Sequence, residues 1–92
     1  MDDTIDARFA AFHAENPHVY VLLVRLALDA KQRGATKIGA KALMERARWD
    51  LALETRGYPY KLNNDFTSRY ARLIADTCPD LAPMFSFRRL AA

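Results

Sequence analysis

Hydrophobic residues recur every three or four positions along most of the chain, a spacing typical of amphipathic α-helices. Over residues 3–15 this spacing predicts a short helix, for which Asp3 or Thr4 can serve as the N-terminal cap. The apolar stripe of this segment consists of Ile5, Phe9 and Phe12. The step Asn16-Pro17 then begins a new helix, because asparagine is a favourable cap and proline suits the first helical position.

The second predicted helix, from residue 17 to about residue 33, is apolar on almost every side. One face consists of Val19, Leu22, Leu23, Leu26, Ala27 and Ala30, and much of the other consists of Val21, Val24 and Leu28. Such a helix is typically buried on several sides, so we expect it to be the central element of the fold. Arg25 and Asp29 can form an ion pair on its polar strip, and Gly34 ends the helix.

A third helix is expected to begin after a cap at Thr36 and to run to about residue 56, before Gly57 and Tyr58-Pro59. Its inner face consists of Ile38, Leu43, Met44, Ala47 and Leu51, widened by Trp49 and Leu53. The opposite side consists of Lys41, Glu45, Arg48, Ala52 and Thr55. Arg46 and Asp50 are spaced to form an ion pair.

A fourth helix is expected from Asn63 or Asn64 to the Cys78-Pro79 step, and the tail beyond it suits either a short helix or a strand. The inner side of this helix consists of Phe66, Tyr70, Leu73, Ile74 and Thr77, and the outer side of Asp65, Ser68, Arg69, Arg72 and Asp76. The sequence therefore predicts one all-α domain over residues 1–92. This domain is a small four-helix bundle, helix-turn-helix-like, with a short C-terminal helix or strand.

The composition narrows the classes of function. A chain of 92 residues forms one small domain with no room for a large buried active site. Cys78 is the one cysteine, which excludes an intramolecular disulfide, and no metal-type spacing joins it to His13 or His18. The apolar run of residues 19–24 is far shorter than the roughly 20 residues of a membrane span, and no signal peptide is evident. We expect a cytoplasmic protein without cofactor, metal or membrane attachment.

Charge is divided unevenly along the chain. Residues 1–30 carry a net charge of −3, and residues 31–92 carry a net charge of +6. This asymmetry is compatible with an anionic partner, and equally with an ordinary solvated surface of mixed ion pairs.

Two stretches are candidates for nucleic-acid contact. Residues 31–43 join two helices through an expected turn of about three residues, as in a helix-turn-helix motif, and would place Lys37 and Lys41 near the second helix start. The alternative is an ordinary helical hairpin, since both helices are longer than the usual motif pair. In residues 61–72, Asn63 or Asn64 could reach base edges at a helix N-terminus that suits phosphate. The alternative there is plain capping by asparagine, with Arg69 and Arg72 paired to carboxylates of the same helix.

The aromatic residues and the candidate catalytic residues give weaker indications of function than the two basic stretches. Trp49, Tyr58 and Tyr60 lie among basic residues and could stack on unpaired nucleotides, although packing at the end of a small core is the interpretation we favour. Neither histidine has a serine, cysteine or acid at a diagnostic spacing, and no glycine-rich phosphate loop occurs. We therefore do not expect an enzyme.

Several stretches are similar to a group of short bacteriophage and prophage proteins to which no activity is attached. These stretches are NPHVY (16–20), KIGAKALMERARWD (37–50), YKLNND (60–65), RYARL (69–73) and PDLAPMF (79–85). The resemblance implies a small phage accessory protein inside a bacterial host cell, and it assigns no role to any residue.

The leading hypothesis is a nucleic-acid-binding protein, such as a DNA-binding regulator, that neutralises phosphates with a basic helical face. The residues predicted to form this face are Lys37, Lys41, Arg48, Lys61, Asn63, Asn64, Thr67, Ser68, Arg69 and Arg72. The alternative is a protein-interaction module, such as a phage factor that binds and inhibits a host protein or defence complex. A homodimer is compatible with either hypothesis.

Overall fold

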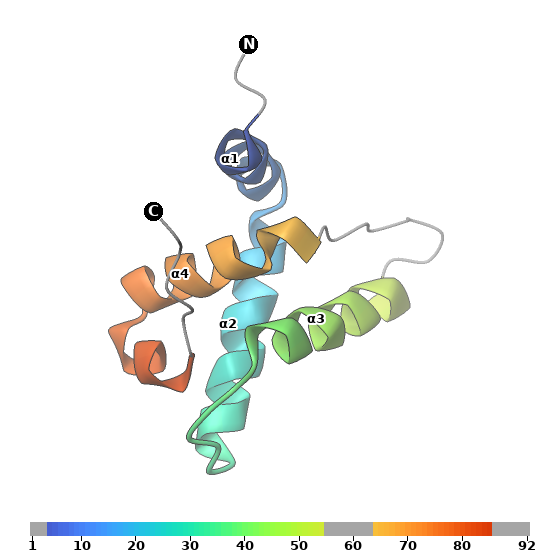
Figure 1. Cartoon of the computed structure of the whole chain (residues 1–92). Helices are drawn as coiled ribbons and strands as arrows, with labels where there is room; N and C mark the ends of the chain where they lie inside the picture. Colours follow the sequence, from blue (N-terminus) through green and yellow to red (C-terminus); the bar gives the residue numbers. More distant parts are fainter. Residues whose placement is uncertain (1–3, 55–63, 86–92) are drawn as a thin grey trace.

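The structure is a computed structural model that describes residues 4–54 and 64–85. Helix α1 (Ile5–Glu15) is followed by α2 (Pro17–Gln32) and α3 (Ala40–Glu54). A short 3₁₀ turn, η1 (Asn64–Phe66), leads into α4 (Thr67–Thr77), and a second 3₁₀ helix, η2 (Pro79–Met84), comes last. The described residues contain no strand, so the prediction of an all-α protein with four main helices is confirmed (Figure 1).

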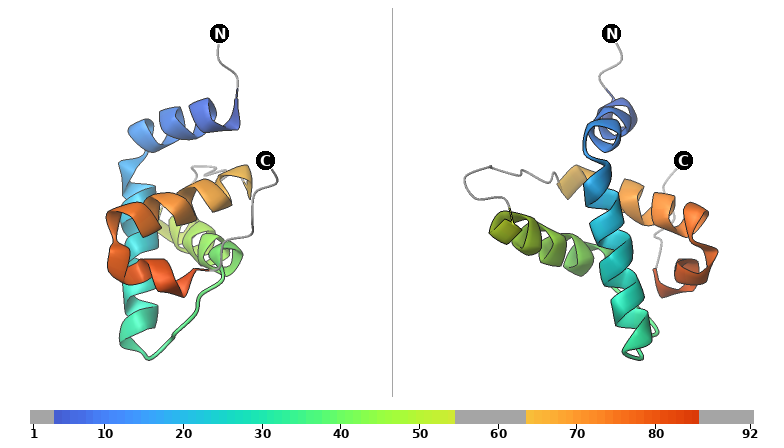
Figure 2. Two further views of the ribbon diagram at one scale, coloured as in Figure 1. Left: turned by 60° about the vertical axis from the view of Figure 1, so that its left-hand side comes forward. Right: turned by 180° about the vertical axis from the view of Figure 1, so that it is seen from behind.

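Helix α2 is the element against which the other α-helices pack. It contacts α1, α3 and α4. Helices α3 and α4 cross the same side of α2, while α1 crosses near its N-terminal end (Figure 1). Seen from behind, α2 lies in front of both α3 and α4 (Figure 2). The prediction that residues 17–33 form the central helix is confirmed.

The core lies between α2 on one side and α3, α4 and η2 on the other. Its buried residues are Val19, Leu22, Leu23, Ala27, Leu43, Met44, Ala47, Leu51, Phe66, Tyr70, Ala71, Ile74, Leu81, Met84 and Phe85. Helix α1 contributes no fully buried residue, but Phe9 packs edge-on against Tyr70, with ring centroids 4.8 Å apart. The predicted burial of several residues in and beside α3 and α4 is confirmed, namely Leu43, Met44, Ala47, Leu51, Phe66, Tyr70 and Ile74.

One side of α2 is open, contrary to the expectation that this helix is buried on several sides. Val21 is 52% exposed and Leu28 is 42% exposed, with Val24 partly buried between them. The reason is geometric: these residues lie opposite Val19 and Leu23, on the side that no described helix covers. We call Val21, Val24 and Leu28 the outer strip of α2.

The connection between α2 and α3 is not the short turn expected of a helix-turn-helix motif. Seven residues, 33–39, separate the two helices, and α3 begins at Ala40 rather than after Thr36. The backbone N–H of Ile38 donates to the carbonyl of Met84 at 2.8 Å, and Ile38 packs partly buried against the core. This contact with η2 holds the segment out of helical conformation.

Gly34 fits the prediction that it ends the second helix. Its φ of +98° lies in the region that glycine adopts without strain. The backbone N–H of Gly34 donates to the carbonyl of Lys31 at 3.0 Å, which closes the last turn.

The local ion pairs follow the predictions only in part. Arg46 and Asp50 pair as expected, at 3.3 Å. Asp29, however, pairs with Arg33 at 3.0 Å rather than with Arg25. An acid that precedes its base by four residues is the better arrangement on a helix, and the positive charge of Arg33 also suits the C-terminal end of α2.

Candidate functional site

Helices α3 and α4 meet through their N-terminal halves, and this contact organises several of the predicted site residues. Ala40 and Met44 of α3 line the same small interior space as Thr67 and Ala71 of α4. These four residues therefore define the sides of the two helices that face each other.

Basic and hydroxyl side chains lie next to the contact residues on each helix. Lys41 directly follows the contact residue Ala40, and Arg48 lies two helical turns further along α3 on the same side. On α4, Ser68 follows Thr67, and Arg72 lies one turn beyond Ser68. We call Lys41, Arg48, Ser68 and Arg72 the seam surface.

Helical spacing places Lys41 and Arg48 on one side of α3, and Ser68 and Arg72 on one side of α4. Lys41 and Arg72 are exposed, and Arg48 and Ser68 are partly buried. The exposed carboxylate of Glu45 lies on the same side of α3 and opposes this positive charge.

Two further predicted site residues, Lys37 and Arg69, bind other parts of the protein, and so does Lys31. Lys37 donates from Nζ to the carbonyl oxygen of Pro83 at 2.9 Å, and Lys31 binds the carbonyl of Asp80 in the same way at 3.2 Å. Arg69 does not rely on a carboxylate of its own helix, as the alternative interpretation expected. Its Nε lies 3.0 Å from Oδ1 of Asp6 on α1.

The predicted helix start at the two asparagines differs in the structure. Helix α4 begins at Thr67, preceded by η1, and no side chain caps its N-terminus. The 3₁₀ turn places Phe66 in the core, where its ring centroid lies 5.6 Å from that of Phe9 and 5.3 Å from that of Phe12. Lys61 and Asn63 lie outside the described residues, as does the side chain of Asn64.

Trp49 was expected in the widened inner face of α3, and this expectation is wrong. Its side chain is 64% exposed. The sequence contained the signal: Trp49 is two positions from both Ala47 and Leu51, which are buried, and two positions on a helix correspond to opposite sides. Tyr58 and Tyr60, the other aromatic candidates, lie outside the described residues.

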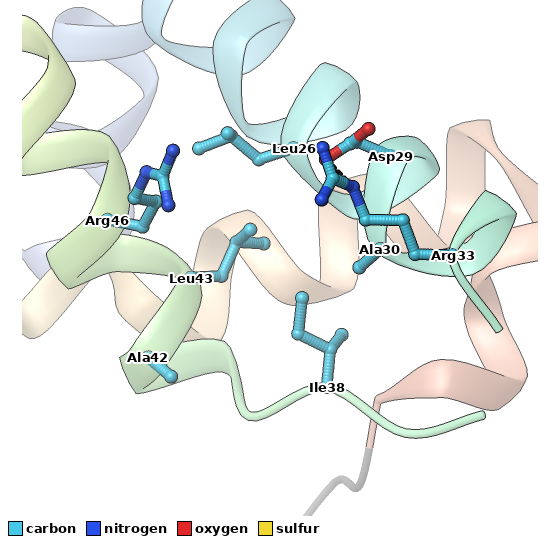
Figure 3. A pocket seen from close by; sticks show the side chains of 8 residues that line it. All are labelled: Leu26, Asp29, Ala30, Arg33, Ile38, Ala42, Leu43 and Arg46. Atoms are coloured by element: carbon cyan, nitrogen blue, oxygen red, sulfur yellow. Dashed lines mark ion pairs between the residues drawn. The ribbon is translucent and has the colours of Figure 1, made fainter. Parts of the chain in front are cut away.

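A groove of about 320 Å³ separates the C-terminal half of α2 from the start of α3 (Figure 3). Its apolar floor consists of Leu26, Ala30, Ile38, Ala42 and Leu43. Arg33 and Arg46 lie at its edges, and each uses Nε to bind a nearby carboxylate, at 3.0 Å and 3.3 Å. Because both arginines are paired, the groove is better suited to an apolar side chain than to a phosphate.

The interface between α1 and α4 contains an unusual pair of buried polar atoms. Tyr70 is 1% exposed, and its hydroxyl has no hydrogen-bond partner among the described residues, nor has Nδ1 of His13. The two rings meet at nearly right angles with centroids 6.3 Å apart. Burial raises the pKa of Tyr70 well above its usual range. Phe9 contacts both rings, stacked on His13 with centroids 6.0 Å apart and edge-on to Tyr70.

Tyr20 connects α2 to the end of α4. Its hydroxyl shares a hydrogen bond with the hydroxyl of Thr77, which also donates to the carbonyl of Leu73 at 2.7 Å. Burial raises the pKa of Tyr20, and the bond from Thr77 partly offsets this. The exposed Thr77, predicted on the inner side of α4, thus contacts α2 through its hydroxyl.

The described residues contain no group of histidine, cysteine and carboxylate side chains that could hold a metal ion. Nor does any helix within residues 4–54 and 64–85 have the length and apolar character needed to cross a membrane. Comparison with protein-family models, curated proteins and solved structures gives no match. What this protein does must therefore be inferred from its own residues.

Proposed function

We propose that this protein binds nucleic acid through the seam surface. One observation carries the proposal: α3 and α4 pack against each other, and each carries basic residues beside the contact, Lys41 and Arg48 on α3 and Arg72 on α4. These residues are far apart in the sequence, and convergence of this kind is what a phosphate-binding face requires.

Each residue has a role that its chemistry suits. Lys41 and Arg72 are exposed and can neutralise phosphates, which releases counterions. Arg48 adds a planar guanidinium that can hold phosphate oxygens in a forked arrangement. The hydroxyls of Thr67 and Ser68 can donate to the same backbone oxygens. Such contacts position a nucleic acid without reading its sequence.

The test uses two double variants that remove equal charge. Lys41→Gln/Arg72→Gln removes two exposed bases from the seam surface, and Arg8→Gln/Arg25→Gln removes two exposed bases from α1 and α2. Fluorescence anisotropy of a labelled oligonucleotide, at two or more salt concentrations, gives the affinity and its salt slope. For a single strand, the logarithm of the affinity falls linearly with the logarithm of the salt concentration, with a slope of about 0.7 per phosphate contact. We therefore expect Lys41→Gln/Arg72→Gln, which removes two contacts, to reduce this slope by about 1.4. Equal effects of both variants, or no binding at low salt, would contradict the proposal.

A second function is favoured by a different observation, the open outer strip of α2. Val21, Val24 and Leu28 line a shallow hollow together with Arg25, Asp29 and Gln32. An apolar strip with polar edges suits the face of another protein, which supports the interaction-module hypothesis, including a homodimer. Sedimentation of the protein and of Val21→Ser/Leu28→Ser tests the homodimer: a dimer that the variant converts to monomer supports it. A monomer at high concentration contradicts it.

Either function is compatible with a phage accessory protein, which the resemblance to phage proteins implies and which stays a prediction. So do the host-protein partner and the location in the cytoplasm of a bacterial cell.

A further inference from the structure

Trp49 is the single tryptophan of the chain, and most of its side chain is in solvent. A tryptophan offers a large apolar surface that usually packs against other residues, yet α3 directs this one away from the core formed by Leu43, Ala47 and Leu51. The preceding helical turn contains Glu45 and Arg46, and Arg46 is paired with Asp50. The indole is therefore presented on a regular helix rather than on a loop.

Trp49 lies on the same helix as Lys41 and Arg48 of the seam surface. Lys41, Glu45 and Trp49 are spaced four residues apart, so they form one row along the exposed side of α3. At 1.5 Å per residue, Lys41 and Trp49 are separated by about 12 Å along the helix axis. This length corresponds to roughly three or four stacked nucleotides of one strand.

We propose that Trp49 is a stacking platform for an unpaired base, and that the protein binds single-stranded nucleic acid. The inference rests on the proposed function, because the seam surface supplies the contacts to phosphate. In a duplex, each base is covered on both faces by its neighbours, whereas an unpaired base can place its face on an exposed indole. A basic surface beside an exposed aromatic side chain is the arrangement that binds single strands.

Glu45 makes the proposal more specific. Its carboxylate lies in the row between Lys41 and Trp49 and repels a phosphate that passes between them. A strand that binds along this row must therefore pass on the side of Arg48. Glu45→Gln removes the repulsion, and we expect it to tighten binding of a single strand by roughly twofold or more.

The experiment compares Trp49→Ala and Trp49→Phe with the unchanged protein. The probe is a fluorescently labelled oligo(dT) of about 12 nucleotides, and a duplex of equal length serves as the second probe. Anisotropy reports binding without depending on the tryptophan. We expect Trp49→Ala to weaken binding of the single strand about tenfold, Trp49→Phe to retain most of it, and binding of the duplex to be weaker and unchanged by either substitution.

Intrinsic fluorescence gives a direct second readout, because Trp49 is the sole source of tryptophan emission. Stacking on a base should quench this emission as the oligonucleotide is added. Circular dichroism confirms that each variant is folded, and little loss is expected for a side chain that is 64% exposed.

The outcomes separate this inference from the function on which it rests. Binding that Lys41→Gln/Arg72→Gln weakens but Trp49→Ala leaves unchanged overturns the role of Trp49 and keeps nucleic-acid binding. A preference for duplex over single strand also overturns it. No binding of either probe at low salt overturns both, and Trp49 would then be a candidate contact for a protein partner.

Discussion

Arg69 on α4 binds Asp6 on α1: its Nε lies 3.0 Å from Oδ1 of Asp6, although 63 positions separate the two residues in the sequence. This ion pair joins the first helix to the fourth at the edge of the molecule. It also occupies one of the arginines that the sequence predicted for nucleic-acid contact. A substitution that breaks the pair should therefore both weaken the attachment of α1 and leave more positive charge on α4.

Loss of this ion pair should cost little stability. The side chain of Asp6 is 80% exposed, and water screens such a pair, so we expect Asp6→Asn to lower the free energy of unfolding by less than about 1 kcal/mol. Urea unfolding of Asp6→Asn, Arg69→Gln and the double variant measures the coupling in a double-mutant cycle. A loss of several kcal/mol would contradict this expectation and show that the pair is not an ordinary solvent-screened surface pair.

Release of Arg69 should favour an anionic ligand. Asp6→Asn removes the carboxylate that pairs with its guanidinium, so we expect tighter binding of an oligonucleotide than in Glu15→Gln, which removes an exposed acid from the far end of α1. Anisotropy at low salt makes the comparison. Equal affinities would show that Arg69 lies away from the bound strand.

The buried hydroxyl of Tyr70 predicts an unusual gain of stability. Because this hydroxyl lacks a partner among the described residues, its desolvation is uncompensated, and Tyr70→Phe removes that cost while keeping the ring contacts with Phe9. We expect a gain of about 1 kcal/mol in urea unfolding. A loss of similar size would instead indicate that the hydroxyl makes a favourable bond.

The same residue predicts an alkaline loss of stability. Burial raises the pKa of Tyr70 in the folded protein, so below about pH 10 both the folded and unfolded states keep the proton. Above about pH 10 the unfolded state loses the proton first, and the free energy of unfolding falls as pH rises. The decline should be steeper in the unchanged protein than in Tyr70→Phe, as measured by urea unfolding between about pH 8 and 11.

Two leucines of α2 should respond very differently to truncation. Leu23 has no exposed surface, whereas Leu28 on the outer strip is 42% exposed. We expect Leu23→Ala to cost about 2–5 kcal/mol and Leu28→Ala less than about 1 kcal/mol in the monomer. Thermal or urea unfolding of both variants measures the difference. A large cost for Leu28→Ala that grows with protein concentration would point to a dimer through the outer strip.

The two described glycines between α2 and α3 should also differ. Gly34 has a φ of +98°, so an alanine there is strained, and we expect Gly34→Ala to cost about 1 kcal/mol or more. Gly39 has no such φ, and an added Cβ would lie 3.9 Å from that of Ala42, which is ordinary contact. Gly39→Ala should therefore be neutral or stabilising in the same unfolding measurement.

Features that depend on near neighbours in the chain could be predicted from the sequence. Tyr70 and Ile74 lie four residues apart, so their common burial follows from the geometry of one helix. The start of α2 at Pro17 and the pairing of Arg46 with Asp50 are equally local. The candidate site was predictable only as a set of residue types, since Lys41 and Arg72 lie on different helices.

The tertiary structure decided which predicted faces and partners meet. Val21 and Leu28 are as apolar as the core residues of α2, but they remain exposed because α3 and α4 pack on the same side of that helix. The first residue of α3 depends on the bond from Ile38 to Met84, and the partner of Arg69 lies on α1. The spacing of hydrophobic residues in one helix predicts which side of that helix is apolar. Only the crossing of helices that are distant in sequence settles which apolar side is covered and which charges come together.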